Sequence, residues 1–113
     1  MTAEELVVQE ISAIFNHRLY PDIAPQEPLP EFPFAVYSVV SATPISTNCR
    51  NNHRVSIQID IWTLDAAKRS ALWQAVHQKL VQAGGKMTAR RQNFYSDTRS
   101  YRASLDFDFF VSI

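Results

Sequence analysis

The chain ends on a segment in which apolar and polar side chains alternate. From Tyr101 to Ile113 every odd-numbered position is apolar, and every even-numbered position is polar except Phe110. A period of two is typical of a β-strand with one buried and one solvated face. The segment His53–Trp62 has the same period, with a valine and isoleucines at its odd positions from 55 to 61. These two segments are predicted to be the most regular strands of a sheet.

The helical spacing of apolar residues occurs in two other segments. Thr2 and Glu5 have the spacing of a helix capping box. The apolar residues that follow recur every three to four positions: Val7, Ile11, Ile14 and Phe15. Asp65 can cap a second helix that reaches about Ala83, where Gly84–Gly85 can end it. We therefore expect two amphipathic helices, each with one stripe that must be buried.

Between these segments the sequence predicts two further strands and three irregular stretches. Phe34–Ala42 is rich in aromatic and β-branched residues, and Met87–Tyr95 is a weaker strand. Residues 21–33 contain five prolines, which forbid helix and ladder pairing, so we expect an extended surface strap. Thr43–Asn52 is polar and rich in turn-forming residues, so a long loop is predicted there. A turn is expected at Ser96–Ser100.

The resulting element order is α-β-β-α-β-β, in a chain whose 113 residues are enough for a single domain, 1–113. Two amphipathic helices can cover one face of a four-stranded, mostly antiparallel sheet. If the second and fourth strands are neighbours, all pairs are antiparallel and the spatial order is 1-2-4-3. The predicted fold class is therefore α+β, with the two most regular strands at the centre of the sheet.

The charge of the chain is balanced overall but unevenly distributed. Eleven basic and eleven acidic residues argue against a general binder of nucleic acids or anionic membranes. Residues 1–33 contain six acidic residues and one arginine, a net charge of −5, so the remainder carries +5. The acidic N-terminus lacks the form of a signal peptide, and no apolar run approaches the roughly 20 residues of a membrane span. A single cysteine, Cys49, fits a reducing compartment.

The sequence contains no motif for catalysis or for metal or cofactor binding. His17, His53 and His77 lie near no second ligand at metal-binding spacing. Cys49 lies in a polar stretch without a nucleophile signature. The two glycines follow a helix, whereas a phosphate cradle needs them before one. We therefore expect a protein that is not an enzyme and that uses no metal and no cofactor.

Three aspartates, Asp60, Asp106 and Asp108, would share the polar sheet face if the two regular strands pair. Paired carboxylates can perform acid–base chemistry or bind a hard cation. Alternate polar residues on a strand are, however, also the ordinary solvated face of a half-buried sheet. The solvated face is the interpretation that we favour.

The segment 86–102 carries five basic residues and one aspartate, a local charge of +4, interleaved with aromatic residues. Such a surface can bind single-stranded nucleic acid, which is the alternative function for this chain. Trp62 and Phe110 are large apolar residues on otherwise polar strand faces. Either they form a protein interface or they are buried under the proline-rich strap. The candidate interface residues are Trp62, Arg90, Arg91, Phe94, Tyr95, Arg99 and Phe110.

Four stretches, in this order along the chain, resemble the phage tail-completion family, whose members terminate the tail or join it to the head. They are LYPDIAP at Leu19–Pro25, PFAVYSVVS at Pro33–Ser41, the strand-to-helix segment Val55–Leu80, and YRASLDFDFFV at Tyr101–Val111. Together they span most of the chain. The resemblance implies a non-enzymatic structural protein of phage or prophage origin.

The resemblance further implies a ring of subunits, often a hexamer, at the head-proximal end of the tail. Its partners would be tail-tube and head-connector proteins, with no role for a membrane and no expectation of direct nucleic-acid binding. Assembly would take place in the cytoplasm of a bacterial host, and isolated subunits could stay monomeric until they meet the tail tube. In a head-to-tail ring, acidic residues 1–33 of one subunit would face the basic hairpin 86–102 of the next.

Overall fold

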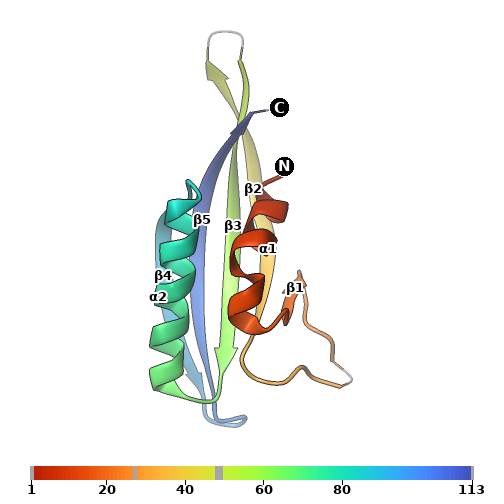
Figure 1. Ribbon diagram of the computed structural model, residues 1–113, viewed down its shortest axis with the longest axis vertical. Helices are drawn as coiled ribbons and strands as arrows, with labels where there is room; N and C mark the ends of the chain where they lie inside the picture. The colour runs from red at the N-terminus through yellow and green to blue at the C-terminus, as the bar shows by residue number, and fades with distance from the viewer. Residues whose placement is uncertain (1, 27, 48–49, 113) are drawn as a thin grey trace.

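The computed structural model describes residues 2–26, 28–47 and 50–112. Two helices and a five-stranded sheet form an α+β fold, which confirms the predicted class (Figure 1). The elements are α1 (Ala3–Ile11), the 3-10 helix η1 (Ser12–Phe15), β1 (Leu19–Pro21), β2 (Phe34–Thr47), β3 (Arg50–Thr63), α2 (Ala66–Gln82), β4 (Lys86–Tyr95) and β5 (Ser100–Ser112). The molecule is elongated, with extents of 51 × 26 × 23 Å.

The strand order of the sheet is β1-β2-β3-β5-β4. The four long strands are antiparallel and stand in the predicted order, with the two most regular strands, β3 and β5, as neighbours. The predicted number of strands, four, was one too low. The fifth strand is β1, which pairs in parallel with β2 from Leu19↔Ala35 to Pro21↔Tyr37. A three-residue strand is too short to show a period of two, so the alternation of side chains could not reveal it.

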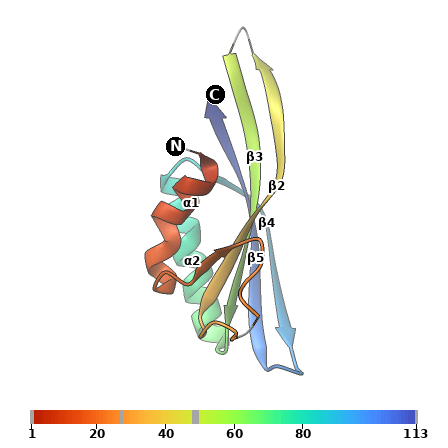
Figure 2. The same ribbon diagram turned by 90° about the vertical axis from the view of Figure 1, so that its right-hand side faces the viewer.

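The long loop predicted at Thr43–Asn52 was also wrong. Strand β2 continues to Thr47 and β3 begins at Arg50, in a register that runs from Thr43↔Arg54 to Thr47↔Arg50. The two strands thus form a long hairpin that projects beyond the helices (Figures 1 and 2). Ladder pairing uses backbone groups, so a polar sequence can extend a hairpin that its apolar part has already aligned.

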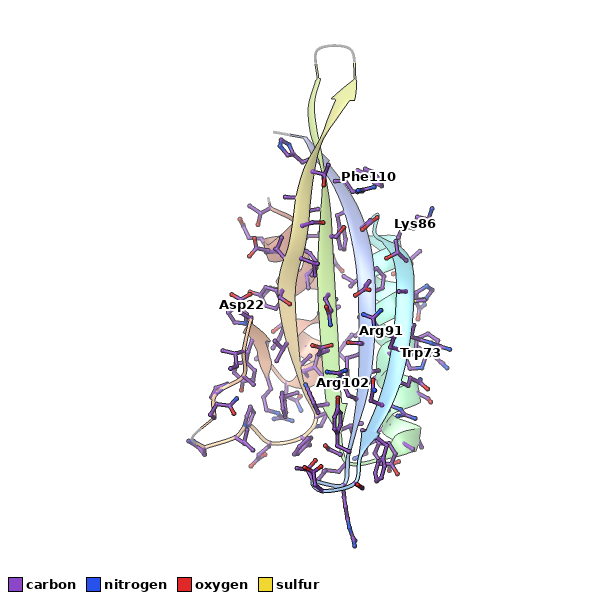
Figure 3. The ribbon with its side chains drawn as sticks, turned by 180° about the vertical axis from the view of Figure 1, so that it is seen from behind. Asp22, Trp73, Lys86, Arg91, Arg102 and Phe110 are labelled. Carbon is purple, nitrogen blue, oxygen red and sulfur yellow. The ribbon has the colours of Figure 1, made fainter. Side chains whose placement is uncertain are left out.

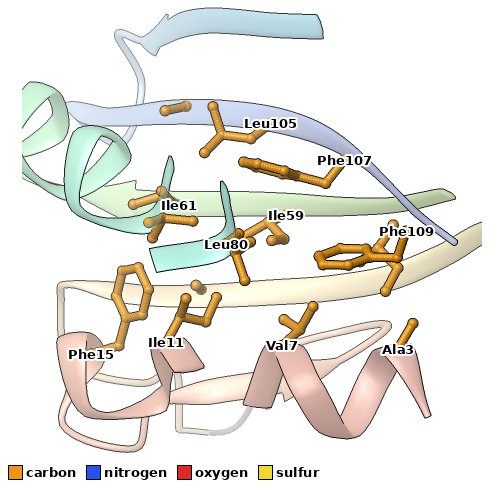
Figure 4. Close-up of a cluster of buried hydrophobic side chains, with 14 residues drawn as sticks. Ala3, Val7, Ile11, Phe15, Ile59, Ile61, Leu80, Leu105, Phe107 and Phe109 are labelled. Atoms are coloured by element: carbon orange, nitrogen blue, oxygen red, sulfur yellow. The ribbon is translucent and has the colours of Figure 1, made fainter. Parts of the chain in front are cut away.

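Both helices lie on the same face of the sheet, as predicted (Figure 2). The side chains at the odd positions of β3 and β5 point toward the helices, which is why these strands alternate in the sequence. The core that results is closely packed between the two layers (Figure 4). Its fully buried large side chains include Val7, Ile11 and Phe15 from α1 and η1, Val76 and Leu80 from α2, and Ile57, Ile59, Ile61, Leu105 and Phe107 from the sheet.

The helix ends follow the predicted signals. The backbone N–H of Glu5 donates to the Thr2 hydroxyl at 3.1 Å, which completes the capping box of α1. At the start of α2 the Asp65 carboxylate accepts from the N–H of Ala67 at 2.8 Å. Gly84 ends α2 with a φ of +99°, a conformation that glycine adopts without strain.

Candidate assembly interface

The face of the sheet opposite the helices is built from the even positions of β3 and β5 (Figure 3). Its centre is a network of polar side chains. The Ser56 hydroxyl donates to Asp108 at 2.6 Å, and the Gln58 amide donates to Asp60 at 3.2 Å. The hydroxyl of Ser104 also donates to Asp60. We call this surface the open face.

The three aspartates predicted for the polar side of the sheet all lie on the open face, but they bind separate partners. Asp106 forms an ion pair with Arg91 at 3.1 Å, while Asp60 and Asp108 accept from hydroxyl and amide groups. Within the described residues, no group of three or more His, Cys, Asp or Glu side chains could hold a metal ion. The arrangement is that of a solvated polar surface with internal hydrogen bonds.

Two apolar side chains interrupt this polar surface. Phe110 is 61% exposed on β5, so the strap does not bury it. Val40 is 62% exposed on β2, where the register shifts between Val39 and Ser41. A β-bulge leaves one residue unpaired, which accounts for the exposure of Val40. Phe110 is labelled in Figure 3 at the end of the face near the projecting hairpin.

Trp62 has a different environment, because the proline-rich strap covers its end of the open face. Its indole stacks on Phe34, with ring centroids 6.3 Å apart and an angle of 17° between the planes. Phe32 and Ala24 of the strap pack into the same cluster. The Arg18 guanidinium fixes the strap by donating to the carbonyl of Pro33 at 3.1 Å. Trp62 is therefore half-buried beneath the strap, while Phe110 stays exposed.

A groove of about 620 Å³ lies between the strap and this end of the sheet. Phe34 and Trp62 form part of its apolar lining, and Asp22 is one of its few charged residues. Two other lining residues, Ile23 and Leu29, are 69% and 60% exposed. We call this cavity the strap groove. Ile23 and Leu29 were not among the predicted site residues. Apolar residues that lie among prolines and cannot join the core are, however, a usable sequence signal for such a surface.

The basic segment 86–102 does not form one surface, because neighbouring residues of β4 point to opposite faces of the sheet. Arg90 lies on the helix side, where its guanidinium is 4.0 Å from the centroid of the Trp73 ring in α2. Arg91 lies on the open face, where it pairs with Asp106. The pairing register explains this division, since Arg90 stands opposite the buried Leu105.

The aromatic residues of this segment divide in the same way. Phe94 lies on the helix side against Tyr101, with ring centroids 4.8 Å apart, and is 53% exposed. Tyr95 lies on the open face 5.4 Å from Trp62, and the guanidinium of Arg102 is 5.6 Å from each of these two rings. The predicted interface residues therefore occupy two faces and one turn of the molecule, and Arg99 is exposed in that turn.

Opposite edges of the sheet carry opposite charge. The edge with β4 has the exposed basic residues Lys86, Arg90 and Arg91, whereas α1 and the strap lie at the edge with β1. Exposed acidic residues of that second edge include Glu4, Glu5, Asp22 and Glu31. Burial raises the pKa of Tyr37 on β2, and the carboxylates of Glu4 and Asp22 raise it further. The electrostatic potential at the β1 edge is therefore negative.

No helix within the described residues is long and apolar enough to cross a membrane.

Comparison with known proteins gives both a family and a fold. No curated protein matches the chain significantly. A solved structure described as the virion of a native gene transfer agent particle contains a chain with the same fold, at a TM-score of 0.78. The two chains share 16% sequence identity, over 98% of this chain and 95% of the other.

The sequence also matches a family model over residues 5–112, which is almost the whole chain. The family is described as tail completion protein gp17. This match agrees with the resemblance seen in the four sequence stretches, and it includes the hairpin and the basic segment that those stretches left out. The chain therefore belongs to the tail completion protein gp17 family, a family of structural proteins of the phage tail.

Proposed function

We propose that this protein closes the tail of a phage or phage-like particle as a ring of subunits and offers that ring to the head. The observation that carries the proposal is the opposite charge of the two sheet edges. In a ring each subunit uses two different surfaces, one for each neighbour, so complementary edges are what it requires. A two-fold dimer that paired the same edge of both subunits would instead place like charges together.

The open face and the projecting hairpin are the surfaces left for other tail or head proteins. Phe110 and Val40 supply exposed apolar anchors in the part of the open face that lies outside the strap, where Ser56, Gln58 and the aspartates form internal hydrogen bonds. This composition is typical of interfaces that form between proteins already folded and soluble. The proposed role is thus contact rather than chemistry, during assembly in the bacterial cytoplasm and afterwards in the virion tail.

The alternative of nucleic-acid binding receives less support from the arrangement. A single-strand binder needs basic and aromatic groups along one groove. Here Arg90 and Phe94 lie on the helix side, while Arg91 and Tyr95 lie on the open face. A gel shift with single-stranded DNA at low salt tests this alternative, and salt-sensitive binding would restore it.

Electron microscopy with and without tail tubes tests the proposed function. Tubes incubated with the protein should end in a ring at one end and stop elongating. The variant Arg90→Glu/Arg91→Glu should lose the ring, because it reverses the charge of the β4 edge. Lys79→Glu, which changes an exposed lysine on α2 and leaves both sheet edges and the open face intact, is the control and should keep it. Tubes that elongate equally with and without the wild-type protein would contradict the proposal.

A further inference from the structure

We propose that Phe94 of one subunit inserts into the strap groove of its neighbour and that this contact closes the ring. The inference rests on the proposed function, since it names the side chains by which two copies of this chain would meet. The occupant of the groove is thus a second copy of the same protein. Four features of the two surfaces support the inference: their apolar character, their charge, their position along the strands, and the side of the sheet on which each lies.

The chemistry of the two surfaces is complementary. The strap groove is lined mainly by apolar side chains, and its walls include Ile23 and Leu29, both more than half exposed. Phe94 is an aromatic side chain on the opposite edge strand and is itself 53% exposed. Burying an aromatic ring removes roughly 150–250 Å² from water, so such residues commonly serve as anchors of interfaces.

The charges around these two surfaces are also complementary. Arg90 lies on the same side of β4 as Phe94, four residues along the strand. The guanidinium of Arg69 is closer to the anchor, 5.0 Å from the centroid of the Tyr101 ring on which Phe94 packs. The strap groove has Asp22 in its lining, and the exposed Glu31 lies in the same strap. The basic region around Phe94 would therefore meet the acidic entrance of the strap groove. This charge complementarity favours a contact between Phe94 and the groove over a contact between two Phe94 regions or between two grooves.

Anchor and groove lie at the same level of the molecule, as the strand registers show. Phe34 stands opposite Trp62, Trp62 opposite Arg102, and Arg102 opposite Asn93. This row crosses the sheet from the floor of the strap groove to the residue next to Phe94. A subunit turned about an axis along the strands, without a shift along it, can therefore bring the two surfaces together. A contact without such a shift closes into a ring when its rotation divides a full turn, whereas a contact with a shift produces a helical filament.

The two surfaces face opposite ways, which determines how neighbouring subunits overlap. Phe94 points to the helix side of the sheet, where it packs on Tyr101. The strap groove lies on the open face, above Phe34 and Trp62. One subunit must therefore place the helix side of its β4 edge over the strap end of the open face of the next subunit, which leaves the rest of that face free for other proteins. Such a contact uses two different faces and is heterologous by construction.

Disulfide trapping tests the proposed contact in the full-length protein. In a Cys49→Ser background, the double variant Phe94→Cys/Leu29→Cys should form, on oxidation, a ladder of covalent oligomers that ends at the size of the ring. Each single-cysteine variant can form no species larger than a covalent dimer. The control pair Phe110→Cys/Leu29→Cys should give no ladder, although Phe110 is as exposed as Phe94. A ladder from the control pair, or none from the test pair, would overturn the inference.

A second experiment separates this inference from the proposed function. Phe94→Asp and Leu29→Asp change exposed side chains on the two surfaces, so each monomer should fold. Each variant should raise the concentration needed for ring formation on tail tubes about tenfold or more, as loss of an interface anchor does. If the wild type forms rings and Phe94→Asp forms them equally well, only the inference falls. If the wild type forms no rings under any condition, both fall.

Discussion

Phe107 and Phe110 lie three positions apart on β5 and meet opposite environments. Phe107 is fully buried beneath the helices, whereas Phe110 is 61% exposed on the open face. Phe107→Ala should lower the free energy of unfolding by about 3–5 kcal/mol, because it leaves a cavity in the core. Phe110→Ala should change it by less than about 0.5 kcal/mol. Urea denaturation of both variants measures the difference, and equal losses would show that the faces of β5 are assigned wrongly.

Tyr37 should make stability depend on alkaline pH. Burial, together with the carboxylates of Glu4 and Asp22, raises the pKa of its phenol above the ordinary 10.0. The folded state thus holds the phenol proton more tightly than the unfolded state. The resulting stability is fully present below pH 10 and is lost as the pH rises through the raised pKa. Above pH 10, the free energy of unfolding of the wild type should therefore fall more steeply than that of Tyr37→Phe. Parallel curves for the two proteins in urea titrations would refute the assignment.

At the scale of single elements, the cap of α2 can be tested by separating hydrogen bonding from charge. The Asp65 carboxylate accepts from the N–H of Ala67 at 2.8 Å. Asp65→Ala should destabilise the protein by about 0.5–2 kcal/mol. Asp65→Asn keeps an acceptor at the same place and should recover most of that loss. Thermal denaturation compares the two, and an asparagine variant as unstable as the alanine variant would mean that charge at the helix terminus dominates.

Elements whose side chains alternate with the right period could be predicted from the sequence. Strands β3 and β5 and the caps at Thr2 and Asp65 follow from local patterns. The order of the four long strands was predicted instead from the condition that all their pairs are antiparallel. Strand β1 could not be predicted, because its backbone pairs with β2 over only three residues. The extension of β2 to Thr47 could not be predicted either, because backbone pairing there needs no apolar side chains.

The candidate interface was predictable only in part, for a related reason. Charge and aromatic content marked the segment 86–102 as a surface. Which of its residues share a face depends on the register of β4 against β5, including the irregularity between Met87 and Ala89. The strap groove depends on how residues 21–33 fold back on Trp62, which is a long-range contact without a local pattern. The sequence therefore identified the residues of the basic segment but could not predict the strap groove.

At the scale of the whole molecule, a head-to-tail ring can be tested by mixing two variants that each lack one of the two contact surfaces. Every subunit must carry both an intact Phe94 anchor and an intact strap groove, because each of its two neighbours uses one of them. Phe94→Asp retains its groove, and Leu29→Asp retains its anchor. When these two variants are mixed, one productive contact remains, between the anchor of the second and the groove of the first. The mixture should therefore stop at a heterodimer.

Native mass spectrometry, at a concentration at which the wild type forms rings, measures this outcome. The mixture should show one species of twice the subunit mass, and each variant alone should stay monomeric. Adding an equal amount of wild-type protein should produce short open chains rather than closed rings, because every variant subunit ends a chain at one side. Complete rings from the two-variant mixture would mean that subunits meet through an isologous contact or through surfaces other than these.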